Sequence, residues 1–306
     1  MLLVIEQMLN GLQLGIMLFL MSAGLTLVFG IMQVINLAHG SFYMIGAYVG
    51  ATVTARTGSF LLGLAVALPA AALVGMLVET VVLRRLYQKD HLDQVLATFG
   101  LIMFFNEVTR MIWGRQPLFM DVPSWLGGSI EIVPGVPYPT YRIAVIAVGI
   151  VVGLFLYLLF TQTRIGMQIR AGASNRQMAG ALGANIKLLY TLVFGLGTLL
   201  AGLAGVMAGP ILAVESGMGE SILILTFVVI VIGGIGSIRG AVAGALLVGM
   251  VDTLGRAFLP TGLRLFFTPA HADGVAASLA SMSVYILMAA VLVWRPRGLL
   301  PAHDPR

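Results

Sequence analysis

Few residues of this chain could take part in chemistry, and their spacing excludes the common enzyme and metal sites. The 306 residues include no cysteine, which excludes thiolate nucleophiles, thiolate metal sites and disulfides. The four histidines lie far apart, and no two of them are four residues apart, as a helical zinc-binding pair would be. No Gly-x-x-x-x-Gly-Lys-Ser/Thr loop is present to hold nucleotide phosphates. We therefore expect a protein that is not an enzyme, holds no metal and binds no cofactor of its own.

The residues best suited to contact a polar solute form one short cluster, Asn36-Leu37-Ala38-His39-Gly40-Ser41. It is the only polar cluster in a charge-free stretch that runs from residue 7 to 55. Amide, imidazole and hydroxyl groups can hydrogen-bond a solute without holding it by a full charge. Irregular backbone at membrane depth is tolerated only where it is buried in protein or lines a watery cavity. We therefore take Asn36, His39, Gly40 and Ser41 as candidates for a solute pathway, and a turn at the membrane surface as the alternative.

The charged residues inside apolar stretches are spaced so that they can neutralise one another. Glu107 and Arg110 are three residues apart, and Asp252 and Arg256 are four apart, so each acid can meet its base on one helix face. Glu79 lies close to basic residues at the end of a stretch, which favours an interfacial ion pair. An ion-coupled carrier would more plausibly keep an unpaired acid at mid-membrane, and none is evident.

The composition is that of a membrane protein. Hydrophobic residues make up 59% of the chain and charged residues 9%, with a mean hydropathy of +1.02, whereas soluble domains carry roughly 25% charged residues. Since one helical crossing needs about 20 apolar residues, the chain has room for about eight to ten crossings. The apolar stretches are 7–55, 57–78, 94–113, 143–163, 188–214, 221–238, 240–259 and 274–294.

The first of these stretches is too long for one crossing and is expected to break at the polar cluster. The chain then has nine apolar segments, or eight full spans if one near the N-terminus is re-entrant. We expect an all-α, polytopic transmembrane helical bundle with eight or nine membrane segments, formed by a single domain over residues 1–306. Because Glu6 is the only early charge, the N-terminus is interpreted as a membrane segment and not as a removed signal peptide.

The basic residues indicate the orientation. Eleven of the 17 Lys and Arg residues fall on one side of the expected spans, which places that side in the cytoplasm. The segment at about 161–187 and the C-terminal tail are then cytoplasmic, and the Pro- and Gly-rich loop at about 114–140 is periplasmic, as is the 260–273 loop. The net charge of +5 therefore reflects topology and not a nucleic-acid partner.

Glycine is abundant inside the apolar segments, with 38 residues in the chain. Small residues four apart let helix backbones approach closely in a membrane. Tight helix packing is the plainer interpretation, and an interface able to slide, as a transporter needs, is the alternative. The candidate packing residues are Gly46, Gly50, Gly205, Gly209, Gly233, Gly234, Gly236, Gly240 and Gly244.

The cytoplasmic segment predicts a short surface helix. Ser174 or Asn175 can cap its start, and Gly183 and Asn185 suit its end. An apolar face on this basic segment would fit the groove of another protein, or would pack on the bundle itself. That face consists of Met178, Ala181, Leu182 and Ile186.

Several segments of the chain resemble those of known permease families. Gln177-Met178-Ala179 with Gly183 resembles the coupling motif of ABC importer permeases, Glu-Ala-Ala followed by three residues and Gly, and matches it at Ala179 and Gly183. Other stretches, in order along the whole chain, resemble the branched-chain amino acid permeases of the LivH/LivM type, closest to LivH. They are Gly24-Leu25-Thr26-Leu27-Val28-Phe29-Gly30, Val34-Ile35-Asn36-Leu37-Ala38-His39-Gly40, Gly46-Ala47-Tyr48, Gly233-Gly234-Ile235-Gly236-Ser237, Gly240-Ala241, Gly244-Ala245 and Arg295-Pro296-Arg297-Gly298-Leu299.

The resemblance implies a permease subunit of an ABC importer in a bacterial inner membrane, working by alternating access. The implied partners are a second related permease (usually as a heterodimer), two cytoplasmic ATPase subunits that bind the ATP, and a periplasmic substrate-binding protein. The residues expected to couple to the ATPases are Arg164, Gly166, Met178, Ala179 and Gly183. Branched-chain or related amino acids are the implied substrates, urea, short amides or another small polar solute are alternatives, and a small-solute channel is a further one.

Overall fold

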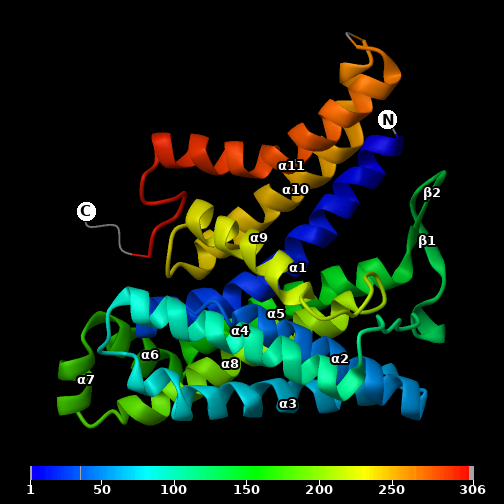
Figure 1. Cartoon of the computed structure of the whole chain (residues 1–306). Helices are drawn as coiled ribbons and strands as arrows, with labels where there is room; N and C mark the ends of the chain where they lie inside the picture. The colour runs from blue at the N-terminus through cyan, green and yellow to red at the C-terminus, as the bar shows by residue number, and fades with distance from the viewer. Residues whose placement is uncertain (1, 35, 266, 303–306) are drawn as a thin grey trace. The chain divides into compact units, whose positions relative to one another are not determined.

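The computed structural model describes residues 2–34, 36–265 and 267–302. Over these residues the chain is mostly helical (Figure 1). The helices are α1 (Leu2–Met32), α2 (His39–Thr57), α3 (Phe60–Val81), η1 (Leu83–Arg85), α4 (His91–Trp113), η2 (Ser124–Leu126), α5 (Thr140–Gln162), α6 (Arg164–Ser174), α7 (Arg176–Ala181), α8 (Ile186–Ala208), α9 (Met218–Gly233), α10 (Ile238–Leu263) and α11 (Pro269–Trp294).

Each apolar segment expected from the sequence forms one helix in the described part of the chain. Seven helical stretches there are long and apolar enough to cross a membrane, and α9 is apolar but shorter. A polytopic helical membrane protein is therefore confirmed, whereas the total of eight or nine membrane segments stays a prediction. The seven stretches are Leu2–Met32, Phe60–Arg85, His91–Trp113, Thr140–Gln162, Ile186–Ala208, Ile238–Leu263 and His271–Trp294.

The long charge-free stretch breaks close to the place predicted from its polar cluster. Helix α1 ends at Met32 and α2 begins at His39, so Asn36 lies in the connection. The Asn36 side-chain oxygen accepts a hydrogen bond from the Ala38 backbone N–H at 3.1 Å, which satisfies a backbone donor just before the new helix starts. His39, Gly40 and Ser41 form the first turn of α2 instead of the break itself.

Strands β1 (Ser129–Val133) and β2 (Val136–Pro139) correct the all-α expectation. They pair antiparallel within the Pro- and Gly-rich loop at about 114–140, for which the sequence predicted no strands. Pro134-Gly135 connects them, and Gly135 has a φ of +85°. A Pro-Gly pair is typical of turns that need a left-handed second residue, so this pair closes a hairpin.

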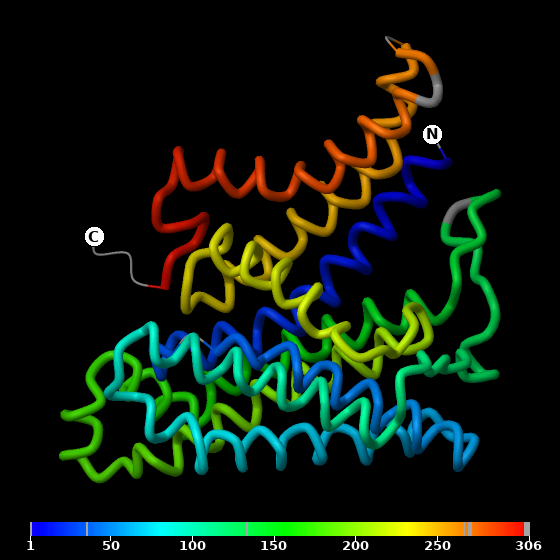
Figure 2. Tube along the Cα trace, in the orientation of Figure 1, coloured from blue at the N-terminus to red at the C-terminus, as the bar shows by residue number. Residues whose placement is uncertain are grey.

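The described chain divides into two compact units. One contains residues 20–123 and 150–225, and its core is formed by α2, α3 and α8. Backbones approach closely there, because a Cβ added at Gly46 would fall under 3.0 Å from Gly202, and one added at Gly205 would do so against Tyr43. Small residues thus allow the helices of this unit to pack backbone to backbone. In the Cα trace the consecutive helices α2 and α3 lie next to each other (Figure 2).

The other unit contains residues 1–19, 124–149 and 226–306. Helices α10 and α11 pack against each other in it. After α11 the chain returns to the end of α9, where the Leu299 and Leu300 N–H groups donate to the carbonyls of Ile232 and Gly233 at 2.8 and 2.9 Å. The C-terminal segment is thereby held by backbone hydrogen bonds.

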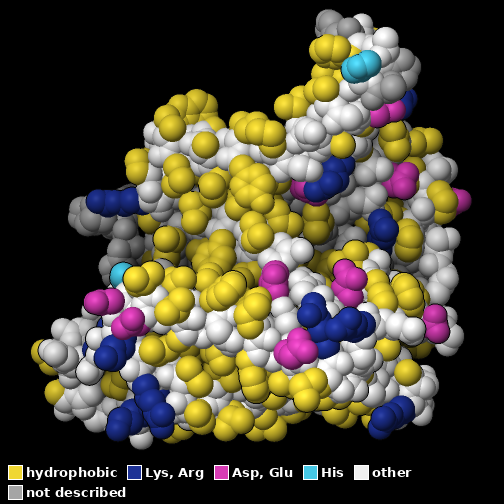
Figure 3. Space-filling view, in the orientation of Figure 1, with side chains coloured by type: hydrophobic (Ala, Val, Ile, Leu, Met, Phe, Trp, Pro, Cys, Tyr) yellow, Lys and Arg dark blue, Asp and Glu magenta, His cyan; other side chains and the backbone are white. Residues whose placement is uncertain are grey.

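Large hydrophobic side chains cover much of the surface. They include Leu73 and Leu77 on α3, Val151 and Leu154 on α5, and Trp294 at the end of α11, each more than half exposed. In the space-filling view hydrophobic side chains spread over the visible face, and charged ones occur in small groups (Figure 3). An apolar exterior of this extent is what a lipid environment requires of a helical protein.

Candidate functional site

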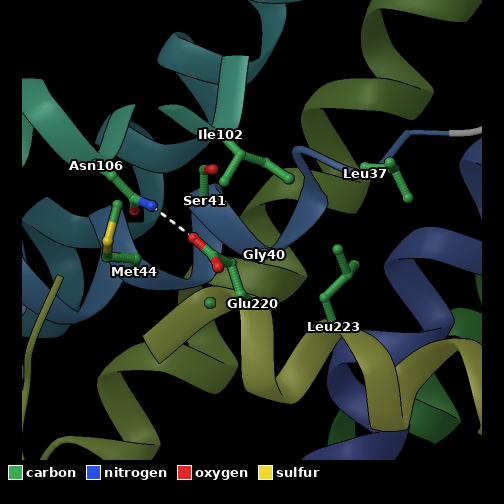
Figure 4. Close-up of a pocket in the computed structure, with 9 residues that line it drawn as sticks. Leu37, Gly40, Ser41, Met44, Ile102, Asn106, Glu220 and Leu223 are labelled. Carbon is green, nitrogen blue, oxygen red and sulfur yellow. Dashed lines mark hydrogen bonds between the residues drawn. The ribbon is translucent and has the colours of Figure 1, made fainter. Parts of the chain in front are cut away.

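A narrow crevice opens where the first turns of α2 and α9 meet α4, all within the unit of residues 20–123 and 150–225 (Figure 4). Two of the four predicted pathway residues, Gly40 and Ser41, line it. The lining residues are Leu37, Gly40, Ser41, Met44, Ile102, Asn106, Gly219, Glu220 and Leu223. The crevice thus combines an apolar wall with one hydroxyl, one amide and one carboxylate.

Gly40 and Gly219 bring the starts of α2 and α9 into backbone contact. A Cβ added to either glycine would fall under 3.0 Å from the carbonyl oxygen of the other, a separation that real Cβ atoms do not show. Any side chain at these positions would therefore push the helix starts apart. Both helices also begin here, so their first-turn N–H groups give this region a partial positive potential.

Asn106 and Glu220 close the crevice on the side of α4. The Asn106 amide nitrogen donates to the Glu220 carboxylate at 2.5 Å, and the two side chains point toward one another in Figure 4. Next to them, Arg110 donates to the Ser216 hydroxyl at 3.1 Å and lies 3.7 Å from the Glu107 carboxylate. Arg110 therefore interacts with Glu107, as the sequence suggested, but not with Glu107 alone. Its bond to Ser216 also links α4 to the segment before α9.

Sequence reasoning missed Glu220 and Asn106. The available signal was a lone acid immediately before the charge-free stretch 221–238. What it could not supply was the pairing across 114 positions, which depends on how α4 and α9 pack.

Asn36 and His39, the other two predicted pathway residues, point into the protein instead of lining the crevice. Both are fully buried. Among the described residues, the Asn36 amide nitrogen and both His39 ring nitrogens make no well-formed hydrogen bond, and the Met21 backbone is the group that approaches the His39 ring as a hydrogen-bond partner. Buried polar groups are nearly always hydrogen-bonded, so this pair is unusual. The structure thus separates the cluster into a crevice-lining half and a buried half, and the pathway role of all four residues stays a prediction.

Glu79 is held in a buried network at the end of α3. Its carboxylate accepts from Arg84 at 2.9 Å, from the Tyr87 hydroxyl at 2.6 Å and from the Thr191 hydroxyl at 2.7 Å. Burial, and then the hydrogen bond to Glu79, raises the pKa of Tyr87. The ion pair expected from the sequence is present, and the structure adds Thr191, which joins the network to α8, the helix that follows α7.

The segment at about 161–187, predicted to be cytoplasmic, forms two helices, α6 and α7, where the sequence predicted one. Asn175 caps α7 by accepting from the Met178 N–H at 2.9 Å. Gly183, with a φ of +90°, ends it, and the Ala184 N–H reaches back to the Ala179 carbonyl at 3.0 Å. Asn185 does not end this helix but caps α8, accepting from the Leu188 N–H at 3.1 Å.

The residues expected to couple to an ATPase differ in exposure. Met178 and Leu182 are 58% and 82% exposed and are therefore available to a partner, and Arg164 is exposed as well. Ala179 is buried against the chain itself, so it does not offer the small outward face expected of it. Gly166 is also buried, because it packs on the backbone at the end of α5.

The remaining candidate glycines lie at close approaches or turns. Gly50 and Gly209 both lie near Met120. Gly233 and Gly240 face each other, since a Cβ on either would fall under 3.0 Å from the other's carbonyl oxygen. Gly244 lies as close to the Val229 carbonyl, and Gly234 and Gly236 have φ values of +108° and +80° in the turn before α10.

Comparison with known proteins identifies the family. The family model for the branched-chain amino acid transport system permease component matches residues 7–293. The chain belongs to this permease family. The family is a transport component and not an enzyme, which agrees with the sequence prediction.

Individual relatives cover most of the permease. The high-affinity branched-chain amino acid transport system permease protein LivH of Salmonella typhimurium is 31% identical over 272 residues, which cover 84% of this chain and 87% of LivH. The corresponding protein BraD of Pseudomonas aeruginosa is 29% identical over 97% of this chain and 95% of its own. The ribose import permease protein RbsC of Escherichia coli is 27% identical over 80% of this chain and 74% of its own. No solved structure matches the chain.

Proposed function

We propose that this permease is the membrane-spanning subunit of an ABC importer that carries branched-chain or related amino acids across a bacterial inner membrane. The proposed pathway passes the crevice between the starts of α2 and α9, and the contact between Gly40 and Gly219 is the observation that carries this proposal. Two helix starts that touch through glycines alone can separate and return without unpacking side chains. Such a contact suits alternating access, in which the pathway opens to one side at a time.

The proposed source of energy lies in partner subunits. Two cytoplasmic ATPases would bind ATP and receive α7, whose exposed Met178 and Leu182 suit an apolar groove. The permease would need no cofactor of its own. A second related permease would complete the pathway, and a periplasmic binding protein would deliver the solute.

The substrate class is proposed from the relatives named above. LivH and BraD are named for branched-chain amino acids, while RbsC is named for ribose. Another small polar solute, such as a sugar, urea or a short amide, is therefore the second candidate. A channel is the remaining alternative and would give flux without ATP.

Reconstitution tests these alternatives together. The permease is purified with its partner subunits, placed in liposomes and supplied with the binding protein, and uptake of labelled leucine, ribose, urea and acetamide is measured with and without ATP. We expect ATP-dependent uptake of leucine above the other solutes. Uptake of ribose or urea in preference would reassign the substrate, and equal flux without ATP would refute the importer mechanism.

A further inference from the structure

The other unit contains a polar site of its own. It is an open groove of about 400 Å³ between the first half of α1, the start of α5 and the second half of α10. All of its lining residues belong to the unit of residues 1–19, 124–149 and 226–306. They are Gln7, Asn10, Gln13, Leu14, Arg142, Asp252, Thr253, Arg256 and Ala257.

The groove is far more polar than membrane helices normally allow. Ionisable residues within membrane segments are costly and usually face a functional, water-accessible cavity. Asp252 is paired with Arg256, whose guanidinium donates to both carboxylate oxygens at 2.9 and 3.0 Å, as the sequence spacing predicted. Yet the pair does not merely neutralise itself inside the protein, because it lines an open groove together with a second arginine and three amides.

Polar side chains also line the groove along one face of α1. Gln7, Asn10 and Gln13 recur every three residues and therefore follow one helix face. Arg142, in the first turn of α5, donates to the Asn10 side chain, and Asn10 donates to Gln7 at 3.4 Å. Gln13 is the most buried of the three and is 6% exposed. Among the described residues, its amide nitrogen donates only to the Met17 sulfur, at 2.9 Å. Sulfur is a weak acceptor, so this amide is poorly satisfied as the structure stands.

We propose that this groove is an outer binding site for the transported solute and that it takes a zwitterionic α-amino acid. The guanidinium of Arg142 matches a carboxylate, and the carboxylate of Asp252 with the amide oxygens matches an ammonium group. A volume of about 400 Å³ falls in the range of small-molecule sites. The basic-residue count places the start of α5 on the periplasmic side, from which the solute would arrive. The inference rests on the proposed importer function.

Labelling of a single cysteine tests occupancy directly, because the chain has no cysteine of its own. Thr253→Cys places a thiol in the groove, and Ser129→Cys, on the exposed hairpin, is the matched control. In the assembled complex we expect leucine to slow labelling at position 253 and not at 129, by about threefold at twice the dissociation constant. The analogues 3-methylbutylamine and 4-methylpentanoate, which lack the carboxylate and the ammonium group respectively, should protect less.

Uptake variants supply the second readout. Gln13→Leu keeps the side-chain volume and removes the amide, so a purely structural Gln13 would tolerate it, whereas a binding residue would lose uptake. We expect Gln13→Leu and Arg142→Gln to lower leucine uptake about tenfold, with ATPase activity and complex yield unchanged, and Arg142→Lys to retain part of it. Arg264→Gln, which removes an exposed arginine outside the groove, is the control.

Each outcome decides the inference. If wild-type complexes import leucine but no groove variant is impaired, or leucine never protects position 253, the outer site is refuted while the importer function stands. A thiol at 253 that reacts in the separate chain but not in the complex, with or without leucine, would show that a partner subunit covers the groove, and would also refute it. Failure of wild-type uptake itself would instead refute the proposed function.

Discussion

Gly40 and Gly219 touch backbone to backbone, although 179 positions separate them, so that neither position has space for a Cβ. The contact joins the first turn of α2, which follows the break in the longest apolar stretch, to the first turn of α9. It also forms one wall of the crevice through which we propose the solute passes. The width of the pathway should therefore depend on these two glycines.

Adding one methyl group at this contact should impair transport more than assembly. Overpacking costs about 1–3 kcal/mol, which shifts a conformational equilibrium by about 5- to 150-fold. We expect Gly219→Ala to reduce uptake by about tenfold or more in reconstituted complexes, with normal complex yield. Gly100→Ala is the control, because a Cβ there would meet no atom within 4 Å. Wild-type uptake in Gly219→Ala would contradict the role of the contact.

His39 should matter for transport and not for stability. Its two ring nitrogens are buried and make no well-formed hydrogen bond to the described residues, and replacing a poorly satisfied buried polar group by an apolar one of similar size is neutral or stabilising. We expect His39→Leu to keep or raise the thermal midpoint of the complex while uptake falls about tenfold. If both uptake and midpoint are unchanged, His39 is not part of the pathway.

The Glu79 network should hold α8 in register with α3. Glu79→Gln removes the negative charge to which Arg84 and Tyr87 donate hydrogen bonds. Because the Arg84 side chain is one third exposed, we expect the free energy of unfolding to fall by about 1–3 kcal/mol. The measurement is the ratio of leucine imported to ATP hydrolysed, which should fall because Thr191 links the network to α8. Tyr87→Phe removes one donor and should have a smaller effect. A lower melting temperature with an unchanged ratio would mark the network as structural only.

The exposed apolar side chains of α7 should be needed for ATPase binding. Leu182 is 82% exposed and ends the face that carries Met178. We expect Leu182→Asp to reduce ATPase co-purification and uptake about tenfold, because a charge opposes burial in an apolar groove. Leu265→Asp, at a residue 81% exposed elsewhere on the chain, should have little effect on co-purification. Equal co-purification of both variants with the wild type would refute the docking role.

Gly240 should be intolerant of branched side chains. A Cβ there would clash with the Gly233 carbonyl oxygen and lie near Leu300 of the returning C-terminal segment. We expect Gly240→Val to lower the yield of intact complex severalfold, since overpacking costs about 1–3 kcal/mol. Gly262→Val, in the same helix but with no atom within 4 Å of the added Cβ, should leave the yield nearly unchanged and so separates crowding from helix propensity.

The helical elements and the class of protein were predictable from the amino-acid sequence alone. Long apolar runs must become helices in a membrane, because no water is present to satisfy the backbone, and each of the predicted segments is helical in the described residues. The pairing of Asp252 with Arg256 was also predictable, because it depends only on the spacing along one helix. The family followed in the same way, from motifs that occur in order along the chain.

Contacts between residues far apart in the sequence became known from the packing of the helices. The sequence predicted the polar cluster as one site, yet packing buries Asn36, in the connection before α2, and His39, while Gly40 and Ser41 line the crevice. Within α2 the separation arises because successive residues of a helix point about 100° apart. Helices far apart in the sequence lie side by side and bring polar residues together. Asn106 meets Glu220 in this way, and Gln13 and Arg142 line the same groove. Local spacing carries no information about such contacts, since they depend on how whole helices pack.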